Sequence, residues 1–252
     1  MSFSLSASLN GDKIASHFKE YGYVSIPGVL PDENAKRVHK ALLESTPWNL
    51  VFNDRGKHID LTSGQLHTMP AQSVKQLQQA IYNQAQDNFQ YCYNNYPIYD
   101  AYKDGLNKGH VLHLFYEWLD SEDFLTFARV VTGFDDISFV DAQATRYNPG
   151  HFLTSHDDTL DGKKRRAAYI FNFTPDWPPD WGGYLQLLDD DGHIRRGLRP
   201  TFNTLNIITV PQLHNVSLVA PFAGSVRLSI SGWLRYGDPA IDGEASGSPK
   251  SP

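Results

Sequence analysis

Cysteine is almost absent from this sequence, since one residue, Cys92, occurs among 252. A single cysteine excludes an internal disulfide and a cysteine-rich metal site. No apolar run approaches the roughly 20 residues that a membrane helix needs, so we expect no membrane partner. The first residues, Met1 to Ser6, lack both a basic start and an apolar stretch, which predicts no secretion signal and a cytoplasmic protein.

An excess of basic residues is also missing. The chain has 22 Lys and Arg against 28 Asp and Glu, for a net charge of −6. Nucleic-acid binders usually carry the opposite balance, so we expect no nucleic-acid partner. Hydrophobic residues make up 40% of the chain and aromatic residues 13%, which is enough apolar material for a full core.

The first half of the chain has mainly helical periodicity. Apolar residues at steps of three and four predict helices over residues 12–21, 31–44, 73–93 and 121–131. A short alternating run at 23–26 predicts one strand between the first two helices.

The second half changes to short aromatic and β-branched runs separated by turn residues. These runs predict strands at 139–147, 166–173, 184–188, 204–210, 216–219 and 226–234. Many short strands at this spacing indicate a sandwich or barrel. The sequence therefore predicts one α+β domain over residues 1–237, with helices that buttress the strands, and a disordered tail at 238–252.

A His-x-Asp triplet occurs twice. On an extended segment its histidine and aspartate lie on the same face, as two ligands of one metal must. The triplet at residues 58–60 has no partner set, so we interpret it as a loop. In the later one, His156 and Asp158 share a face, and Asp157 is expected to point away. A jelly roll brings distant strand ends together, which would place His214 beside them. Two histidines and one carboxylate form the facial ligand set of non-haem Fe(II) oxygenases.

The last predicted strand places a positive charge on a polar face. Arg227, Ser229 and Ser231 share one side of this strand, whereas Leu228 and Ile230 share the other. A buried arginine needs an anionic partner, because an unpaired buried charge is costly. A dicarboxylate co-substrate would provide one in two-point contact.

Five motifs follow one another in the second half: DAQATRYNPG at 141–150, SHDD at 155–158, GGYL at 182–185, HNV at 214–216 and RLSISGW at 227–233. In this order they resemble the prolyl-4-hydroxylase-type 2-oxoglutarate/Fe(II) oxygenases, and within them the branch that holds the ribosomal-protein prolyl hydroxylases. The similarity covers about residues 139–236, and residues 21–30 resemble the entry strand of such enzymes. The middle, about 45–135, resembles no family that we recognise.

The resemblance implies a double-stranded β-helix (a jelly-roll, cupin-like core) at about 139–236. It implies His156, Asp158 and His214 as iron ligands and Arg227 as the partner of the distal carboxylate of 2-oxoglutarate. Tyr147 matches a tyrosine near the co-substrate. Tyr169 is a candidate for the tyrosine that assists the arginine in relatives, because this chain has phenylalanine at the matching position. The implied cofactors are Fe(II), 2-oxoglutarate and O2, with ascorbate as an optional addition.

Three functions remain open from the sequence. The first is a dioxygenase that hydroxylates an unactivated C–H bond of a prolyl residue in a protein or peptide, with release of succinate and CO2. The second keeps this chemistry but acts on a free amino acid or another small metabolite. The third is a non-catalytic jelly-roll binding module, although a binder does not need the three ligands and Arg227 together.

Overall fold

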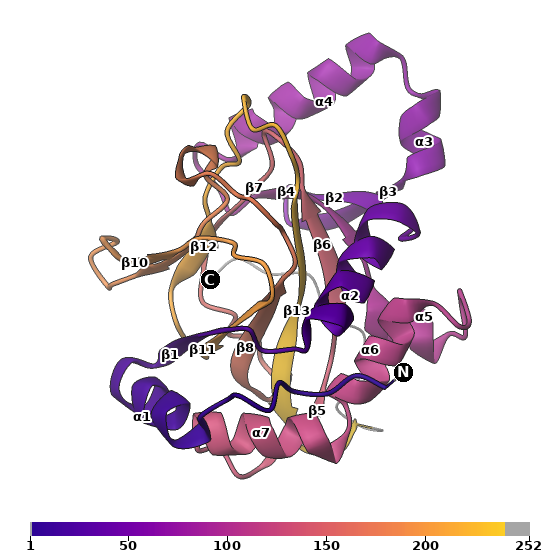
Figure 1. Cartoon of the computed structure of the whole chain (residues 1–252). Coiled ribbons are helices and arrows are strands. Elements are labelled where there is room, and N and C mark those ends of the chain that lie inside the picture. Colours follow the sequence, from indigo (N-terminus) through magenta and orange to yellow (C-terminus); the bar gives the residue numbers. More distant parts are fainter. Residues whose placement is uncertain (1, 240–252) are drawn as a thin grey trace.

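The computed structural model describes residues 2–239, so that nearly all of the predicted tail at 238–252 lies outside the described residues (Figure 1). The α-helices in this range are α1 Gly11–Tyr21, α2 Asp32–Glu44, α3 Ser63–Thr68, α4 Ala71–Gln84, α5 Ile98–Lys103, α6 Val111–Leu119 and α7 Glu122–Thr132. A 3-10 turn, η1, covers Pro179–Trp181. The strands are β1 Tyr23–Pro27, β2 Asn49–Asp54, β3 Lys57–Thr62, β4 Tyr91–Tyr96, β5 Ile137–Val140, β6 Gln143–Tyr147, β7 Phe152–His156, β8 Arg165–Asn172, β9 Leu185–Leu188, β10 Ile194–Leu198, β11 Thr204–Thr209, β12 His214–Val216 and β13 Arg227–Tyr236.

Local capping signals fix the ends of the first helix. The side chain of Asn10 accepts a hydrogen bond from the backbone N–H of Lys13 at the start of α1. At its end, Gly22 adopts the left-handed conformation, with φ of 73°, and its N–H donates to the carbonyl of Phe18. This helix, α2 and α7 confirm three of the predicted helices.

The predicted helix over residues 73–93 is wrong in its second half. Helix α4 ends at Gln84, and residues 91–96 form strand β4. The apolar residues continue at steps of four as far as Phe89, but the tyrosines at 91 and 93 are both buried in the sheet. Strand β4 pairs with β2, β6 and β7, so tertiary pairing overrides the local periodicity.

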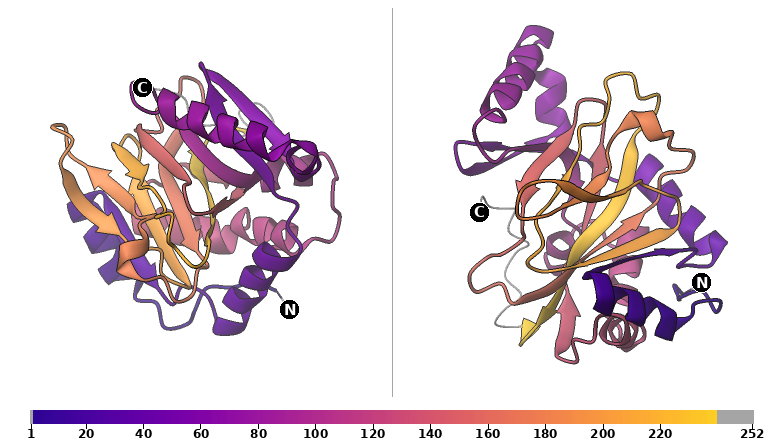
Figure 2. Two further views of the ribbon diagram at one scale, coloured as in Figure 1. Left: turned by 90° about the horizontal axis from the view of Figure 1, so that it is seen from above. Right: turned by 90° about the vertical axis from the view of Figure 1, so that its left-hand side faces the viewer.

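The strands form one curved antiparallel sheet, whose main path β1-β11-β8-β13-β6-β4-β7-β12-β9-β10 curls into a nearly closed barrel (Figures 1 and 2). Off this path, β2 pairs with β3 and β4, and β5 pairs with β13. Helices α1 and α7 lie across one end of the barrel, and α2, α5 and α6 lie along one side. Helices α3 and α4 project at the other end, beyond the β2–β3 hairpin. This arrangement confirms the predicted α+β class.

Alternation along the central strands separates a helix-facing side from an interior side. On β8 and β13, residues including Tyr169, Phe171, Leu228 and Ile230 belong to the core that the helices cover. Their neighbours, such as Arg227, face the barrel interior. The strand register therefore decides which side chains can take part in a site inside the barrel.

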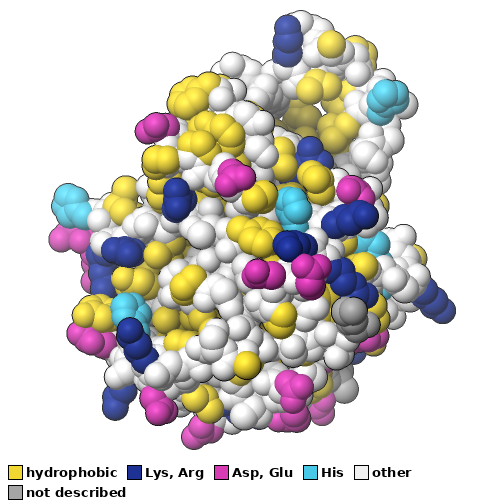
Figure 3. All heavy atoms as spheres, in the orientation of Figure 1, with side chains coloured by type: hydrophobic (Ala, Val, Ile, Leu, Met, Phe, Trp, Pro, Cys, Tyr) yellow, Lys and Arg dark blue, Asp and Glu magenta, His cyan; other side chains and the backbone are white. Residues whose placement is uncertain are grey.

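The surface shows no dominance of one charge on the face drawn in Figure 3, where acidic and basic side chains are interspersed. Within residues 2–239, none of the helices is both long and apolar enough to cross a membrane.

Candidate active site

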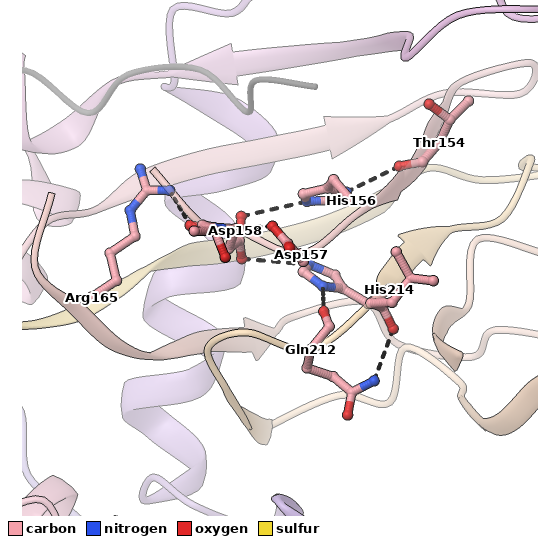
Figure 4. A network of polar contacts seen from close by, with 9 residues as sticks. Thr154, His156, Asp157, Asp158, Arg165, Gln212 and His214 are labelled. Carbon is pink, nitrogen blue, oxygen red and sulfur yellow. Dashed lines mark hydrogen bonds and ion pairs between the residues drawn. The ribbon is translucent and has the colours of Figure 1, made fainter. Parts of the chain in front are cut away.

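Strand pairing brings the three predicted ligand residues together inside the barrel (Figure 4). His156 at the end of β7 and His214 at the start of β12 are direct partners in the antiparallel register. Asp158 follows two residues after His156, and its two carboxylate oxygens lie 3.5 Å from Nε2 of His156 and 3.5 Å from Nε2 of His214. All three residues are buried.

Both imidazole rings are oriented by a backbone carbonyl. Nδ1 of His156 lies 3.0 Å from the carbonyl oxygen of Thr154, and Nδ1 of His214 lies 2.7 Å from that of Gln212. These carbonyls can only accept, so each Nδ1–H donates to its carbonyl, and each Nε2 is left facing Asp158. Ligand histidines in metalloproteins are commonly fixed in this way.

The donor atoms of these three residues all lie within 4.8 Å of one another, close enough to hold one metal ion. Among residues 2–239, no other cluster of three or more His, Cys, Asp or Glu meets that criterion. The set contains two nitrogens and one carboxylate and leaves other coordination positions open, which suits Fe(II) with a co-substrate.

Burial and mutual charge keep this group ready for a cation. Burial, with the neighbouring His156, lowers the pKa of His214 to about 4, so its ring is neutral at neutral pH. Burial alone would raise the pKa of Asp158, but the two facing histidines outweigh it and hold that pKa well below its usual range. The ionised Asp158 carboxylate and the neutral His214 imidazole therefore carry no proton that a metal ion would have to displace.

Arg227 provides a separate positive site in the same cavity. It is 3% exposed, and its Nε has no hydrogen-bond partner. Its guanidinium lies 4.9 Å from the centre of the Tyr147 ring and hydrogen bonds with the Tyr147 hydroxyl. Burial lowers the pKa of Arg227 and raises that of Tyr147 to about 12. The unpartnered donor in a cavity fits the carboxylate of a bound anion.

Tyr93, which was not predicted from the sequence, lines the same cavity from β4. Its ring stacks on that of Tyr147, with centroids 5.1 Å apart and an interplanar angle of 21°. The alternating aromatic residues Phe89, Tyr91 and Tyr93 carry a strand signal that could have identified it. The segment 45–135 therefore contributes directly to the wall of the site.

Tyr169 lines the same cavity as Arg227, but its hydroxyl is engaged elsewhere, and its role as a partner of the arginine stays a prediction. It pairs with Gly232 of β13 and lies on the helix-facing side of β8 with Phe171. Its hydroxyl donates to the carbonyl of Asp141 at 2.7 Å. Arg227 faces the other side of the sheet, so Tyr147 is the tyrosine that accompanies it.

The earlier triplet at residues 58–60 lies on strand β3, in the β2–β3 hairpin, and not in a loop. Nδ1 of His58 lies 2.7 Å from the hydroxyl oxygen of Tyr91. The triplet does not join the ligand group, in agreement with our preference for the later one.

Comparison with known proteins supports this reading of the site. Residues 142–235 match the family model described as the 2OG-Fe(II) oxygenase superfamily. Prolyl 3-hydroxylase OGFOD1 of Mus musculus is 38% identical over 123 residues, which are 46% of this chain and 22% of the mouse protein. The Xenopus laevis protein of the same name is 36% identical over 120 residues, which are 45% of this chain and 23% of that protein. The matched region thus spans less than a quarter of either relative.

Solved structures share the fold at low sequence identity. A Pseudomonas putida prolyl-4-hydroxylase aligns with a TM-score of 0.56 and 15% identity over 89% of this chain and 98% of its own. A prolyl hydroxylase from Trichoplax adhaerens, solved with a peptide fragment of the hypoxia inducible factor oxygen degradation domain, aligns with a TM-score of 0.60 and 15% identity over 94% and 93%. These matches confirm the predicted double-stranded β-helix core.

Proposed function

We propose that this protein is an Fe(II)- and 2-oxoglutarate-dependent dioxygenase, because residues 142–235 match the family model of the 2OG-Fe(II) oxygenase superfamily. The reaction is hydroxylation of an unactivated C–H bond, with release of succinate and CO2. The observation that carries the proposal is the presence, in one cavity, of the His156, Asp158 and His214 group and of the buried Arg227, whose Nε has no partner. A binding module has no need of both.

The residues divide the work between metal and co-substrate. His156, Asp158 and His214 would hold the iron, which supplies the oxygen-activating chemistry when 2-oxoglutarate and O2 are bound. Arg227 binds the distal carboxylate of 2-oxoglutarate, and the Tyr147 hydroxyl orients the guanidinium. Thr145 and Ser229 hydrogen bond to each other at 2.7 Å and add a polar wall to the cavity.

We propose a prolyl residue of a protein or peptide as the substrate. Both curated relatives are named as prolyl 3-hydroxylases, and the Trichoplax adhaerens enzyme was solved with a peptide. The cytoplasm as its location and ascorbate as an added reductant belong to the same proposal. A free amino acid as the substrate is the alternative that the assay below tests.

The metal and co-substrate site is tested by anaerobic titration of the metal-free protein with Fe(II) and 2-oxoglutarate, followed through the visible charge-transfer band of the chelate. We expect the band in the wild type and its loss in His214→Ala. A folded wild-type protein without the band would contradict the proposal.

The substrate is tested by measuring 2-oxoglutarate turnover in the presence of proline-containing peptides and, separately, of free amino acids. Mass spectrometry detects the gain of one oxygen atom in the substrate. Turnover with free amino acids alone would contradict the peptide substrate.

A further inference from the structure

Arg165 is joined to the backbone of the ligand Asp158. The sequence KKRR at 163–166 has the composition of a solvated loop, but Arg165 is partly buried, and its Nη1 donates to the carbonyl oxygen of Asp158 at 2.9 Å (Figure 4). Asp158 has a φ of 64°, in the left-handed region that residues other than glycine seldom adopt. A donor on the carbonyl of such a residue helps to hold the turn that aims the carboxylate.

The same guanidinium rests on the wall of the active-site cavity. It lies 3.5 Å from the ring centroid of Trp233, which lines the cavity from β13. One planar group therefore spans the distance between the ligand turn and the sheet. Guanidinium groups combine stacking and directed hydrogen bonding in this way, whereas an ammonium group does not.

The surroundings of Arg165 explain why its charge is tolerated there. Burial lowers its pKa, and the carboxylates of Asp141 and Asp158 oppose that shift. Arg235, its partner in the β8–β13 register, adds a second positive charge nearby. The two carboxylates offset both positive charges, and an apolar residue at position 165 could not donate to the Asp158 carbonyl.

We propose that Arg165 is a positioning residue for the metal: by bridging the Asp158 carbonyl and the Trp233 ring, it fixes the turn that presents the Asp158 carboxylate between the two histidines. The inference rests on the proposed function, because it requires that this group binds a metal. It assigns Arg165 no contact with substrate or metal.

Simple electrostatics predicts the opposite effect of removing Arg165. A positive charge that interacts with Asp158 disfavours a divalent cation on the same carboxylate, so its loss would tighten metal binding. Positioning predicts weaker binding, because the loss of an outer hydrogen-bond partner typically costs 10- to 100-fold in metal affinity. The sign of the change therefore separates the two roles.

The test is titration of the metal-free protein with Co²⁺, which reports affinity and, through its visible absorption bands, coordination. Arg165→Gln is expected to weaken Co²⁺ binding at least tenfold and to alter the bands. Arg165→Lys keeps the charge but loses the stacked bridge, so it should also weaken binding. Arg166→Gln is the matched control, because Arg166 forms an ion pair with Asp136, with 2.6 Å between Nη2 and Oδ2, and is not paired with the ligand group. This variant should bind Co²⁺ as the wild type does. Thermal unfolding of each variant checks that the fold is retained.

A second background shows whether Arg165 acts through Asp158. In an Asp158→Ala protein, where the histidines alone hold the ion, Arg165→Gln should change the Co²⁺ affinity by less than twofold. Unchanged or tighter binding in Arg165→Gln, full recovery in Arg165→Lys, or an undiminished effect without Asp158 would each overturn the positioning role. If the wild type binds Co²⁺ no better than His214→Ala, the proposed function itself fails with it.

Discussion

His156 and His214 lie directly opposite each other on β7 and β12, with ring centroids 4.2 Å apart. The ligand geometry is thus set mainly by the register of two paired strands. A slip of one residue in β12 would turn His214 to the outer face of the sheet and dismantle the group. Asp158, just beyond the end of β7, completes it from the turn that follows.

Neighbouring aspartates provide a direct test of this geometry. Asp158→Asn should weaken binding of Co²⁺ or Fe(II) at least 100-fold, because the amide removes the one anionic ligand. Asp157→Asn should stay within twofold of the wild type, since the Asp157 carboxylate instead accepts a hydrogen bond from the backbone N–H of Thr159 at 2.8 Å. Isothermal titration calorimetry measures both variants. Equal losses in the two would argue against the assignment of Asp158.

Two arginines on adjacent paired strands test the co-substrate site. Arg227→Gln should weaken 2-oxoglutarate binding at least thirtyfold, about 2 kcal/mol, because it removes the buried charge that meets the carboxylate. Arg146→Gln should have little effect, since Arg146 lies on β6 and donates to the side chain of Asn148 at 3.1 Å. Quenching of tryptophan fluorescence by 2-oxoglutarate in the presence of Co²⁺ gives the affinities. A strong loss in Arg146→Gln would point to a general charge effect.

Tyr147 and Tyr169 should separate binding from stability. Tyr147→Phe removes the hydroxyl beside Arg227 and should weaken 2-oxoglutarate binding by about 1 kcal/mol, or fivefold, at nearly unchanged stability. Tyr169→Phe leaves the buried carbonyl of Asp141 without its donor, so unfolding free energy should fall by about 1 to 2 kcal/mol while affinity is kept. Urea unfolding and ligand titration of each variant measure the two quantities. The reverse pattern would support the role first expected for Tyr169.

The grouping of His156, Asp158 and His214 could be predicted from the His-x-Asp spacing and from the order of motifs that the family resemblance supplies. His156 and Asp158 were expected to share a face of an extended segment, whereas Asp158 has a φ of 64° and reaches the group from the turn after β7. Arg227 could be predicted because alternation puts the polar residues of β13 on one side. The placement of His214 relied on the expected jelly roll, which brings distant strand ends together.

The sequence is least informative where pairing between strands decides the outcome. Tyr169 lies on a strand whose interior face is set by its register with β13, where Ile170 is opposite Ser231. Tyr93 belongs to a segment whose apolar residues follow helical steps until Phe89, and only the contact of β4 with its neighbours makes it a strand. Alternation shows that two faces exist, but it does not show which of them is inside.

Gly232 should be intolerant of any side chain. A Cβ at this position would lie 2.0 Å from the carbonyl oxygen of Asp141 and 2.9 Å from the Tyr169 hydroxyl, so β13 would have to move away from its neighbour. Gly232→Ala should therefore lower the unfolding free energy by about 2 to 3 kcal/mol. Gly197→Ala in β10 is the matched control, because its Cβ would make an ordinary 3.5 Å contact with Tyr184. Similar midpoints in urea for the two variants would contradict this close approach.

His151 should make the fold sensitive to mild acid. Its Nδ1 is buried without a partner, and burial lowers its pKa from the usual 6.5 to about 4. Below pH 6.5 the unfolded chain therefore binds a proton that the folded protein excludes, so stability is full above pH 6.5 and falls as the pH drops toward 4. The loss is on the order of 2 to 3 kcal/mol.

Substitution of His151 should remove that loss. Between pH 7 and pH 4, the unfolding free energy of the wild type is expected to fall by about 2 to 3 kcal/mol more than that of His151→Gln. Urea unfolding of the metal-free proteins measures both. The contribution of His214 has the same sign but is common to both proteins, so it cancels in the comparison. His67→Gln, at an exposed histidine of α3, should follow the wild type. If the neutral His151 imidazole excludes a proton in the folded protein, its replacement by an amide must change the number of protons that are bound on unfolding. Parallel acid profiles for wild type and His151→Gln would therefore show that His151 does not limit stability in acid.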